Sequence, residues 1–194
     1  MSENILKGYD IVLASASPRR KQLLQELGIR FRVQPKEVEE HFDEQLSPVQ
    51  VAEFLSELKA HAFLKEELDD RTVVITADTV VTVDGIILGK PEDYAEAKSM
   101  LQQLSGRSHQ VITGVTLRSA TKTRTFSVTT TVFFKKLSET EIDYYITTFK
   151  PFDKAGAYGI QEWIGHAAVE RIEGSYFNVM GLPSHRLYEE LLAF

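Results

Sequence analysis

Short apolar segments alternate along this chain with helical segments that begin at recognisable caps, and this alternation constrains the fold more than any other feature. Residues Asp10–Ala14 form a run that suits a buried strand. Ser17 follows as an N-cap, and Pro18 fits the first position of a helix. The chain continues in this way without an internal repeat or a low-complexity linker. The sequence therefore predicts a mixed α/β fold.

The predicted strands are expected to form one sheet. Val111–Leu117 and Thr125–Phe134 are rich in Val, Thr and Phe, which is typical of a long antiparallel pair. Asp84 and Gly85 predict a hairpin turn between Val80–Val83 and Ile86–Leu88. We expect a single domain over residues 1–194, with two lobes around a central mixed, partly antiparallel twisted sheet flanked by helices. Further strands are expected at Phe31–Gln34, Thr72–Thr76, Ala167–Ile172 and Tyr176–Met180.

Cap signals and apolar spacing also predict the remaining helices. Ser138 and Glu141 form a capping box, and Pro151 ends the helix that it opens. The others are expected after Ser47, over Tyr94–Leu104 and after Pro183.

Composition excludes several classes of protein. The chain has no cysteine, which excludes disulfides, thiolate metal sites and cysteine nucleophiles. Its 28 acidic and 22 basic residues give a net charge of −6, which argues against nucleic-acid binding. No apolar run approaches the ~20 residues of a membrane span, and the first residues lack a signal-peptide pattern. We expect a cytoplasmic protein that binds neither nucleic acid nor membrane.

The first corner between strand and helix is the strongest local signal for a ligand. A helix N-terminus offers unpaired N–H groups and the positive end of the helix dipole, which suit phosphate. Arg19 and Arg20 lie in the first turn, where that dipole disfavours cations, and Ser15 and Ser17 add hydroxyl groups. Either an anion binds at this corner, or the two arginines are solvated on an ordinary capped helix.

Carboxylates supply the next candidates. Asp78 follows the apolar run Thr72–Thr76, and a carboxylate at a strand end can hold a metal or activate water; the alternative is a turn aspartate. Glu39 and Glu40 lie in an acidic loop that is expected to be solvated surface. They would matter if that loop folded back on Asp78, because clustered oxygens suit Mg²⁺ or Mn²⁺.

Two lysines could join the arginines around a triphosphate. Lys59 lies at the edge of an apolar helix stripe, and Lys90 is held between Gly89 and Pro91. Each taken alone is more typical of a surface lysine than of a ligand. Motifs of P-loop nucleotide hydrolases, Rossmann dehydrogenases and α/β-hydrolases are absent.

Several segments, taken in order, resemble one family. These segments are Leu13–Arg20 (LASASPRR), Ala77–Val81 (ADTVV), Leu88–Pro91 (LGKP), Leu104–His109 (LSGRSH), Asp153–Gln161 (DKAGAYGIQ), Gly174–Tyr176 and Gly181–Pro183. Together they resemble the Maf-like nucleoside triphosphate pyrophosphatases over about residues 10–190, and the 153–161 segment resembles the branch that acts on dTTP and UTP. The chain departs from the family just after Gln161, where Glu162 and Trp163 replace a small, glycine-containing stretch.

The resemblance implies a reaction and a set of site residues. The reaction would be hydrolysis between the α- and β-phosphates with a divalent cation, Mg²⁺ or Mn²⁺, in a cytoplasmic enzyme that forms a homodimer. Asp78 matches the proton acceptor, and Asp78 with Glu39 would hold the metal. The positions that match substrate-binding or specificity residues are Ser17, Arg19, Arg20, Lys59, Thr79, Lys90 and Gln161.

Two other functions remain open on the sequence. One is a nucleotide-binding regulator of cell division that acts at the septum without turnover. The presence of Lys59, Asp78 and Lys90 argues against this function. The other is the sister activity on 7-methyl-GTP. Gln161 makes that activity less favoured, because its amide offers one donor and one acceptor, as the edge of uracil or thymine requires.

Overall fold

The computed structural model describes residues 8–69 and 71–194. Residues 1–7, which lack a signal-peptide pattern, lie outside this described part. Within it, no helix combines the length and the apolar character that crossing a membrane would require.

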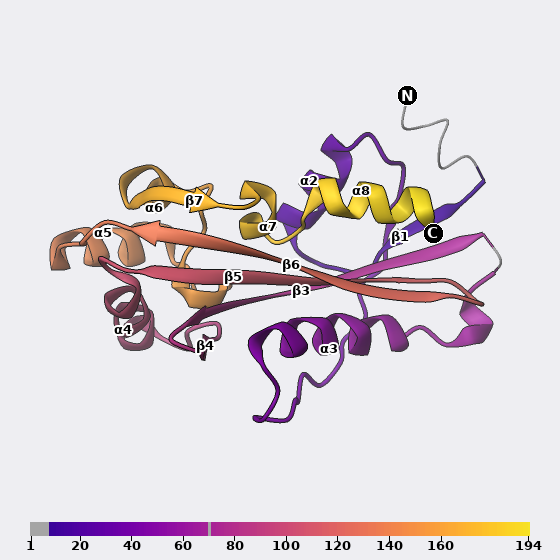
Figure 1. The fold of residues 1–194 in the computed structure, drawn as a ribbon, viewed down its shortest axis with the longest axis horizontal. Coiled ribbons are helices and arrows are strands. Elements are labelled where there is room, and N and C mark those ends of the chain that lie inside the picture. The colour runs from indigo at the N-terminus through magenta and orange to yellow at the C-terminus, as the bar shows by residue number, and fades with distance from the viewer. Residues whose placement is uncertain (1–7, 70) are drawn as a thin grey trace. The chain divides into compact units, whose positions relative to one another are not determined.

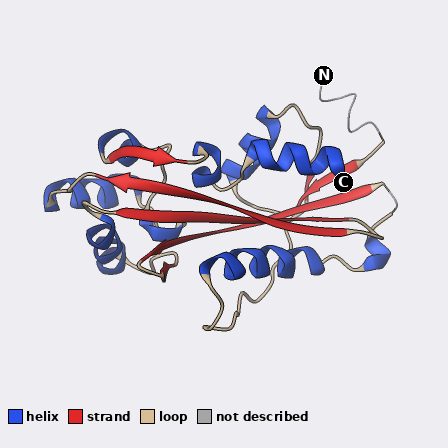
Figure 2. Ribbon diagram, in the orientation of Figure 1, coloured by secondary structure: helices blue, strands red, loops and turns tan. Residues whose placement is uncertain are grey.

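One mixed sheet organises the described chain (Figure 2). Its order is β2-β1-β3-β5-β6-β7, and β4 pairs with β3. β1 pairs in parallel with β2 and β3, whereas β3 with β4 and β6 with β7 are antiparallel. This confirms the predicted mixed α/β class. The strands are β1 (Asp10–Leu13), β2 (Arg32–Val33), β3 (Thr72–Val83), β4 (Ile86–Leu88), β5 (Ser108–Arg118), β6 (Thr123–Phe134) and β7 (Val169–Glu173).

Three of the helices begin at the serine caps that the sequence predicts. Ser17, Ser47 and Ser138 each accept a hydrogen bond from the backbone N–H three residues later, and the latter two form capping boxes. The helices are α2 (Pro18–Glu26), α3 (Pro48–His61), α4 (Tyr94–Leu104), α5 (Glu139–Phe149), α6 (Trp163–Ala167), α7 (Tyr176–Met180) and α8 (Ser184–Ala193), with 3₁₀ turns η1 (Lys65–Glu67) and η2 (Ala155–Ala157).

The prediction of a strand at Tyr176–Met180 is wrong, because this segment is helix α7. Ser175 caps it by accepting the N–H of Asn178 at 3.3 Å. The fully buried Asn178 donates its side-chain amide to the Val111 carbonyl at 3.0 Å. A short apolar run does not distinguish a buried helical turn from a strand. The strand expected at Ala167–Ile172 is β7, which begins two residues later.

The chain separates into two compact units. Among the described residues, unit 1 comprises 8–69, 71–78, 113–128 and 181–194, and unit 2 comprises 79–112 and 129–180. The long strands β3, β5 and β6 contribute to both. In unit 1, α3 lies on one side of these strands and α8 on the other (Figure 1).

Helix α3 packs very closely on the sheet of unit 1. A Cβ atom on Gly114 of β5 would lie 2.2 Å from the carbonyl oxygen of Ala52. The helix backbone therefore rests directly on the backbone of β5. This contact matters for function because α3 carries Lys59.

Candidate active site

The corner between β1 and α2 fixes the Arg20 side chain at several points. Arg20 Nε donates to the carbonyl oxygen of Gly181 at 2.8 Å, and Nη1 donates to Ser15 Oγ at 3.4 Å. The Arg20 N–H donates to Ser17 Oγ, and Arg19 lies half-buried beside it. The first turn of α2 holds no acidic residue. Two guanidinium groups therefore add to the positive end of the helix dipole, an arrangement that suits an anion.

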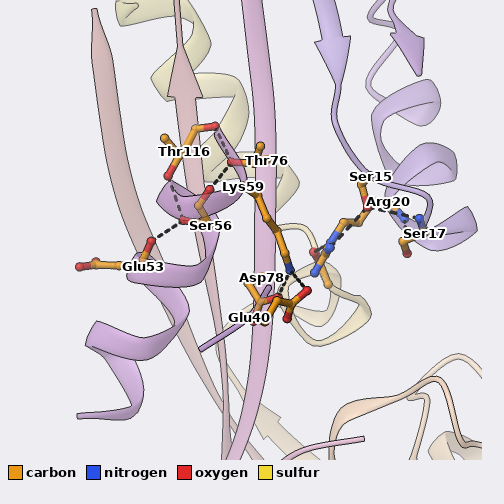
Figure 3. A network of polar contacts seen from close by, with 11 residues as sticks. Ser15, Ser17, Arg20, Glu40, Glu53, Ser56, Lys59, Thr76, Asp78 and Thr116 are labelled. Atoms are coloured by element: carbon orange, nitrogen blue, oxygen red, sulfur yellow. Dashed lines mark hydrogen bonds and ion pairs between the residues drawn. The ribbon is translucent and has the colours of Figure 1, made fainter. Parts of the chain in front are cut away.

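A second group of charges surrounds Lys59 (Figure 3). Its Nζ lies 2.5 Å from Asp78 Oδ1 and 3.0 Å from Glu40 Oε1. The Lys59 and Asp78 side chains are only 17% and 14% exposed. Partial removal from water strengthens such an ion pair and restricts its geometry.

Two buried hydroxyl groups align the elements that carry this pair. Thr76 Oγ1 donates to the Ser56 carbonyl at 2.6 Å, and Ser56 Oγ lies 2.9 Å from Thr116 Oγ1. Thr76 stands two residues before Asp78, on the same face of β3. Ser56 stands three residues before Lys59, on the same face of α3. These contacts therefore set the register in which Lys59 meets Asp78.

Asp78 does not follow a strand, as the sequence predicted, but lies inside the 12-residue strand β3. β1 pairs with β3 as far as Ile75, and β4 pairs with it from Val81 onward. Asp78 therefore lies between these two pairings, and 14% of its side chain is exposed. The two apolar runs on either side of Asp78 therefore belong to one continuous strand, β3.

Arg20 and Asp78 interact electrostatically across unit 1. Burial lowers the pKa of the Arg20 guanidinium, and Arg19 lowers it further, whereas the charges of Asp78 and Glu40 raise it. Figure 3 shows the Arg20 side chain extending toward the side of β3 where Lys59 meets Asp78. Unit 1 thus gathers cations and carboxylates from α2, α3, β3 and the 34–47 loop.

The acidic loop does fold back, and it is Glu40 whose carboxylate reaches Lys59. Glu39 has a side chain that is 92% exposed, with Oε2 lying 3.9 Å from His41 Nε2. The carboxylates that could offer oxygen to a cation beside Lys59 are therefore Asp78 and Glu40. A metal role for Glu39 stays a prediction.

Unit 2 carries the other predicted residues. Lys90 is exposed in the loop after β4, and Thr79 is half-buried on β3. Gln161 lies in a turn before α6, where its side-chain amide packs against Gly159. Its Oε1 atom is buried and has no hydrogen-bond partner among the described residues.

A comparison with known families identifies the chain. Residues 10–194 match the family described as Maf-like protein. The chain belongs to the Maf-like family.

Maf-like relatives match along nearly the whole chain. A "dTTP/UTP pyrophosphatase" of Porphyromonas gingivalis is 53% identical over 97% of this chain and 96% of its own length. A protein of the same description from Phocaeicola vulgatus is 50% identical over 98% of this chain and 98% of its own length. Another from Christiangramia forsetii is 47% identical over 98% of this chain and 97% of its own length. Among solved structures, the Staphylococcus aureus Ham1 protein has a TM-score of 0.48 and 18% identity, over 64% of this chain and 71% of that chain. Similarity at that level does not indicate an activity.

The structure of this Maf-like protein also shows contacts within the site that the sequence did not predict. The Gly181 carbonyl holds Arg20, and Thr76 with Ser56 aligns Lys59. In unit 2, Tyr145 and Lys154 contact the turn that carries Gln161. No local pattern could have revealed these partners, because each pair is separated by many residues along the chain.

Proposed function

We propose that this chain is a nucleoside triphosphate pyrophosphatase that hydrolyses dTTP and UTP to the nucleoside monophosphate and pyrophosphate. The observation that carries the proposal is the near-complete match, at about half identity, to relatives described as dTTP/UTP pyrophosphatases. The charges gathered in unit 1 support it, because they suit a polyphosphate.

Neutralisation of the substrate is the first task of such a site. A triphosphate carries about four negative charges near neutral pH, and these repel an approaching nucleophile. Arg20 at the start of α2 and Lys59 provide positive charge that is held in place before the substrate binds, and Arg19 adds a guanidinium group beside Arg20. Phosphoryl transfer depends chiefly on this kind of positioning and electrostatic stabilisation.

Asp78 is proposed as the proton acceptor. The oxygen of a water molecule attacks the α-phosphorus, and its proton passes to the Asp78 carboxylate. The bond from the α-phosphorus to the bridging oxygen breaks, and pyrophosphate leaves with that oxygen. Lys59, at 2.5 Å, fixes the orientation of the carboxylate for this step.

A divalent cation, Mg²⁺ or Mn²⁺, is proposed as the cofactor. The residues present fit it, because the Asp78 and Glu40 carboxylates both contact Lys59 Nζ through one oxygen and therefore lie close together, and the second oxygen of each could ligate a cation. Mg²⁺ is commonly held by one or two carboxylates, with substrate phosphates and water completing its shell. Across residues 8–69 and 71–194, no three side chains of His, Cys, Asp or Glu form a group that could hold a metal by themselves. The cation would neutralise phosphate charge, and Glu39 remains a further predicted ligand.

Gln161 is proposed to select the base, with Thr79, Arg20 and Lys90 as further substrate contacts. Its amide offers a donor and an acceptor to the edge of uracil or thymine. We expect Gln161→Ala to relax the choice among nucleotides more than it lowers kcat. A variant with the parent's ranking of nucleotides would contradict this role.

The direct test is to incubate the purified protein with dTTP or UTP and Mg²⁺ and to identify the products by ion-exchange chromatography. We expect the monophosphate and pyrophosphate in equal amounts, and loss of turnover when a chelator removes the cation. Release of orthophosphate would overturn the proposed cleavage site. Tight binding of dTTP without turnover in any metal would favour the cell-division regulator, and preference for 7-methyl-GTP in a competition panel would favour the sister activity.

We further propose that the enzyme acts in the cytoplasm as a homodimer, without a nucleic-acid or membrane partner. The basis is the membership of the family together with the net charge of −6. Light scattering on the purified protein would give twice the 22.0 kDa mass of the chain. A mass equal to one chain at micromolar concentration would contradict the dimer.

A further inference from the structure

We propose that Glu162, held by Lys154 and Tyr145, is a positioning residue that fixes the Gln161 amide for pyrimidines whose N3 atom carries a hydrogen. This inference rests on the proposed function, since it assumes that Gln161 meets the base. All the contacts that carry it lie within unit 2.

Glu162 is held by a lysine that is almost completely buried. Lys154 is 7% exposed, and its Nζ lies 3.1 Å from Glu162 Oε1 and 2.7 Å from Asp153 Oδ1. A buried ion pair of this kind adds little net stability, because desolvation offsets the attraction. Its main consequence is geometric, since it fixes where the Glu162 carboxylate lies.

Tyr145 connects this carboxylate to the other end of the turn. Its side chain is fully buried, and its hydroxyl group donates to Glu162 Oε2 and accepts the Gly159 N–H at 3.0 Å. Burial, together with the bond to Glu162, raises the pKa of Tyr145 above its ordinary value, so the phenol keeps its proton. The Trp163 ring stacks on Tyr145 with an interplanar angle of 24° and restrains it further.

The turn between these anchors carries Gln161. The Glu162 N–H donates to the Gly159 carbonyl at 3.0 Å and closes the turn. A Cβ atom on Gly159 would lie 2.8 Å from Gln161 Nε2 and 3.1 Å from Lys154 Cε. The Gln161 amide therefore lies against Gly159 and the Lys154 stem, and both of these are held by the contacts of Tyr145 and Glu162.

The orientation of the amide leaves one acceptor without a donor. Gln161 Oε1 is buried and accepts no hydrogen bond from the described residues. A buried acceptor without a partner is costly, so a ligand that supplies an N–H at this point is favoured. Thymine and uracil supply one at N3, whereas cytosine presents an acceptor there. The network should thus favour dTTP and UTP over dCTP and CTP.

The experiment compares binding of dTTP and dCTP by isothermal titration calorimetry in the parent protein and in Glu162→Ala. Pyrophosphate release is measured in parallel. We expect the ratio of the two dissociation constants to fall about tenfold in Glu162→Ala, the cost of one misaligned hydrogen bond. The kcat for dTTP should stay within about threefold of the parent, since the proposal gives Glu162 no role at the reacting phosphate.

Two further variants separate positioning from folding. Glu162→Gln keeps an oxygen that accepts from Tyr145, and Asp153 still pairs with Lys154, so we expect it to retain most of the discrimination. Tyr145→Phe keeps the ring but loses both hydroxyl contacts, so we expect it to lose discrimination between dTTP and dCTP as Glu162→Ala does. If Glu162→Ala fails to fold, Tyr145→Phe takes its place in the test. His166→Ala is the matched control, because His166 is exposed on the neighbouring helix α6.

Each outcome decides the proposal. An unchanged ratio in Glu162→Ala, or equal weakening of both nucleotides, would overturn the positioning role. A parent protein that binds dTTP without releasing pyrophosphate would refute the proposed function, while the binding ratios would still decide the role of Glu162. Failure of the parent to bind either nucleotide would overturn both.

Discussion

Substitution of Gly114 by alanine tests whether the close contact between α3 and β5 positions the site. The added Cβ would lie 2.2 Å from the Ala52 oxygen, 2.4 Å from its carbon and 2.7 Å from the Glu53 nitrogen. All three atoms belong to the helix backbone and cannot rotate away. Ordinary contact begins near 3.4 Å, so the helix must retreat by about 1.2 Å. Overpacking of this kind costs about 1–3 kcal/mol, and the rigid backbone places Gly114→Ala near the upper end.

Part of this cost is offset because alanine has less conformational freedom than glycine in the unfolded chain. This difference stabilises the folded protein by about 0.4–1 kcal/mol. We therefore expect a net loss of about 2 kcal/mol and a fall in Tm of about 4–8 °C. Thermal unfolding followed by circular dichroism measures this shift. Pyrophosphate release should fall as well, because the displaced helix carries Lys59 away from Asp78.

Gly89→Ala provides the control for stability, since no atom lies within 4 Å of its added Cβ. We expect its Tm to stay within about 2 °C of the parent. A Gly114→Ala protein that unfolds at the parent's temperature and keeps the parent's activity would refute the argument that this contact sets the position of α3.

Three further predictions follow from the geometry. Asp78→Asn should still fold and bind dTTP while kcat falls about 10²–10⁴-fold, as measured by pyrophosphate release; an unchanged kcat would remove Asp78 from the role of base. Thr76→Val loses the 2.6 Å bond to the Ser56 carbonyl, so urea unfolding should show a loss of about 1 kcal/mol, and no loss would mean that this bond does not hold α3. Burial lowers the pKa of His109 to about 4, against about 6.5 in the unfolded chain. Between pH 6.5 and pH 4 the unfolded chain therefore binds more protons than the folded protein. The free energy of unfolding should thus fall by up to about 3 kcal/mol as the pH is lowered through this range. Unfolding of His109→Gln near pH 7 and near pH 4.5 should show a smaller difference than the parent, and an equal difference would contradict the assignment.

The local elements were predictable because their causes are local. Ser17, Ser47 and Ser138 cap helices through hydrogen bonds that span three residues, which a sequence displays directly. The turn at Asp84 and Gly85 takes positive φ angles of 52° and 81°, as expected for a two-residue hairpin. The strand prediction at Tyr176–Met180 is wrong because five residues show no reliable period.

The candidate site was predictable only in part. The corner at Arg20 is a local arrangement and could be recognised, whereas the partner of Lys59 depends on how α3 is aligned with β3 by Thr76 and Ser56. The sequence could not choose between Glu39 and Glu40, because an irregular loop has no period that fixes side-chain direction. The contacts of Tyr145 with the turn that carries Gln161 could not be predicted either, since Tyr145 lies on the separate helix α5.

The most direct test of the proposed reaction is to hydrolyse dTTP in water labelled with heavy oxygen and to locate the label by mass spectrometry. Attack at the α-phosphorus by water that Asp78 deprotonates places the label in the monophosphate and leaves pyrophosphate unlabelled. We expect this pattern in the parent protein, and about 10²–10⁴-fold slower formation of labelled monophosphate in Asp78→Asn. Label in pyrophosphate, or labelled orthophosphate as the first product, would contradict the account.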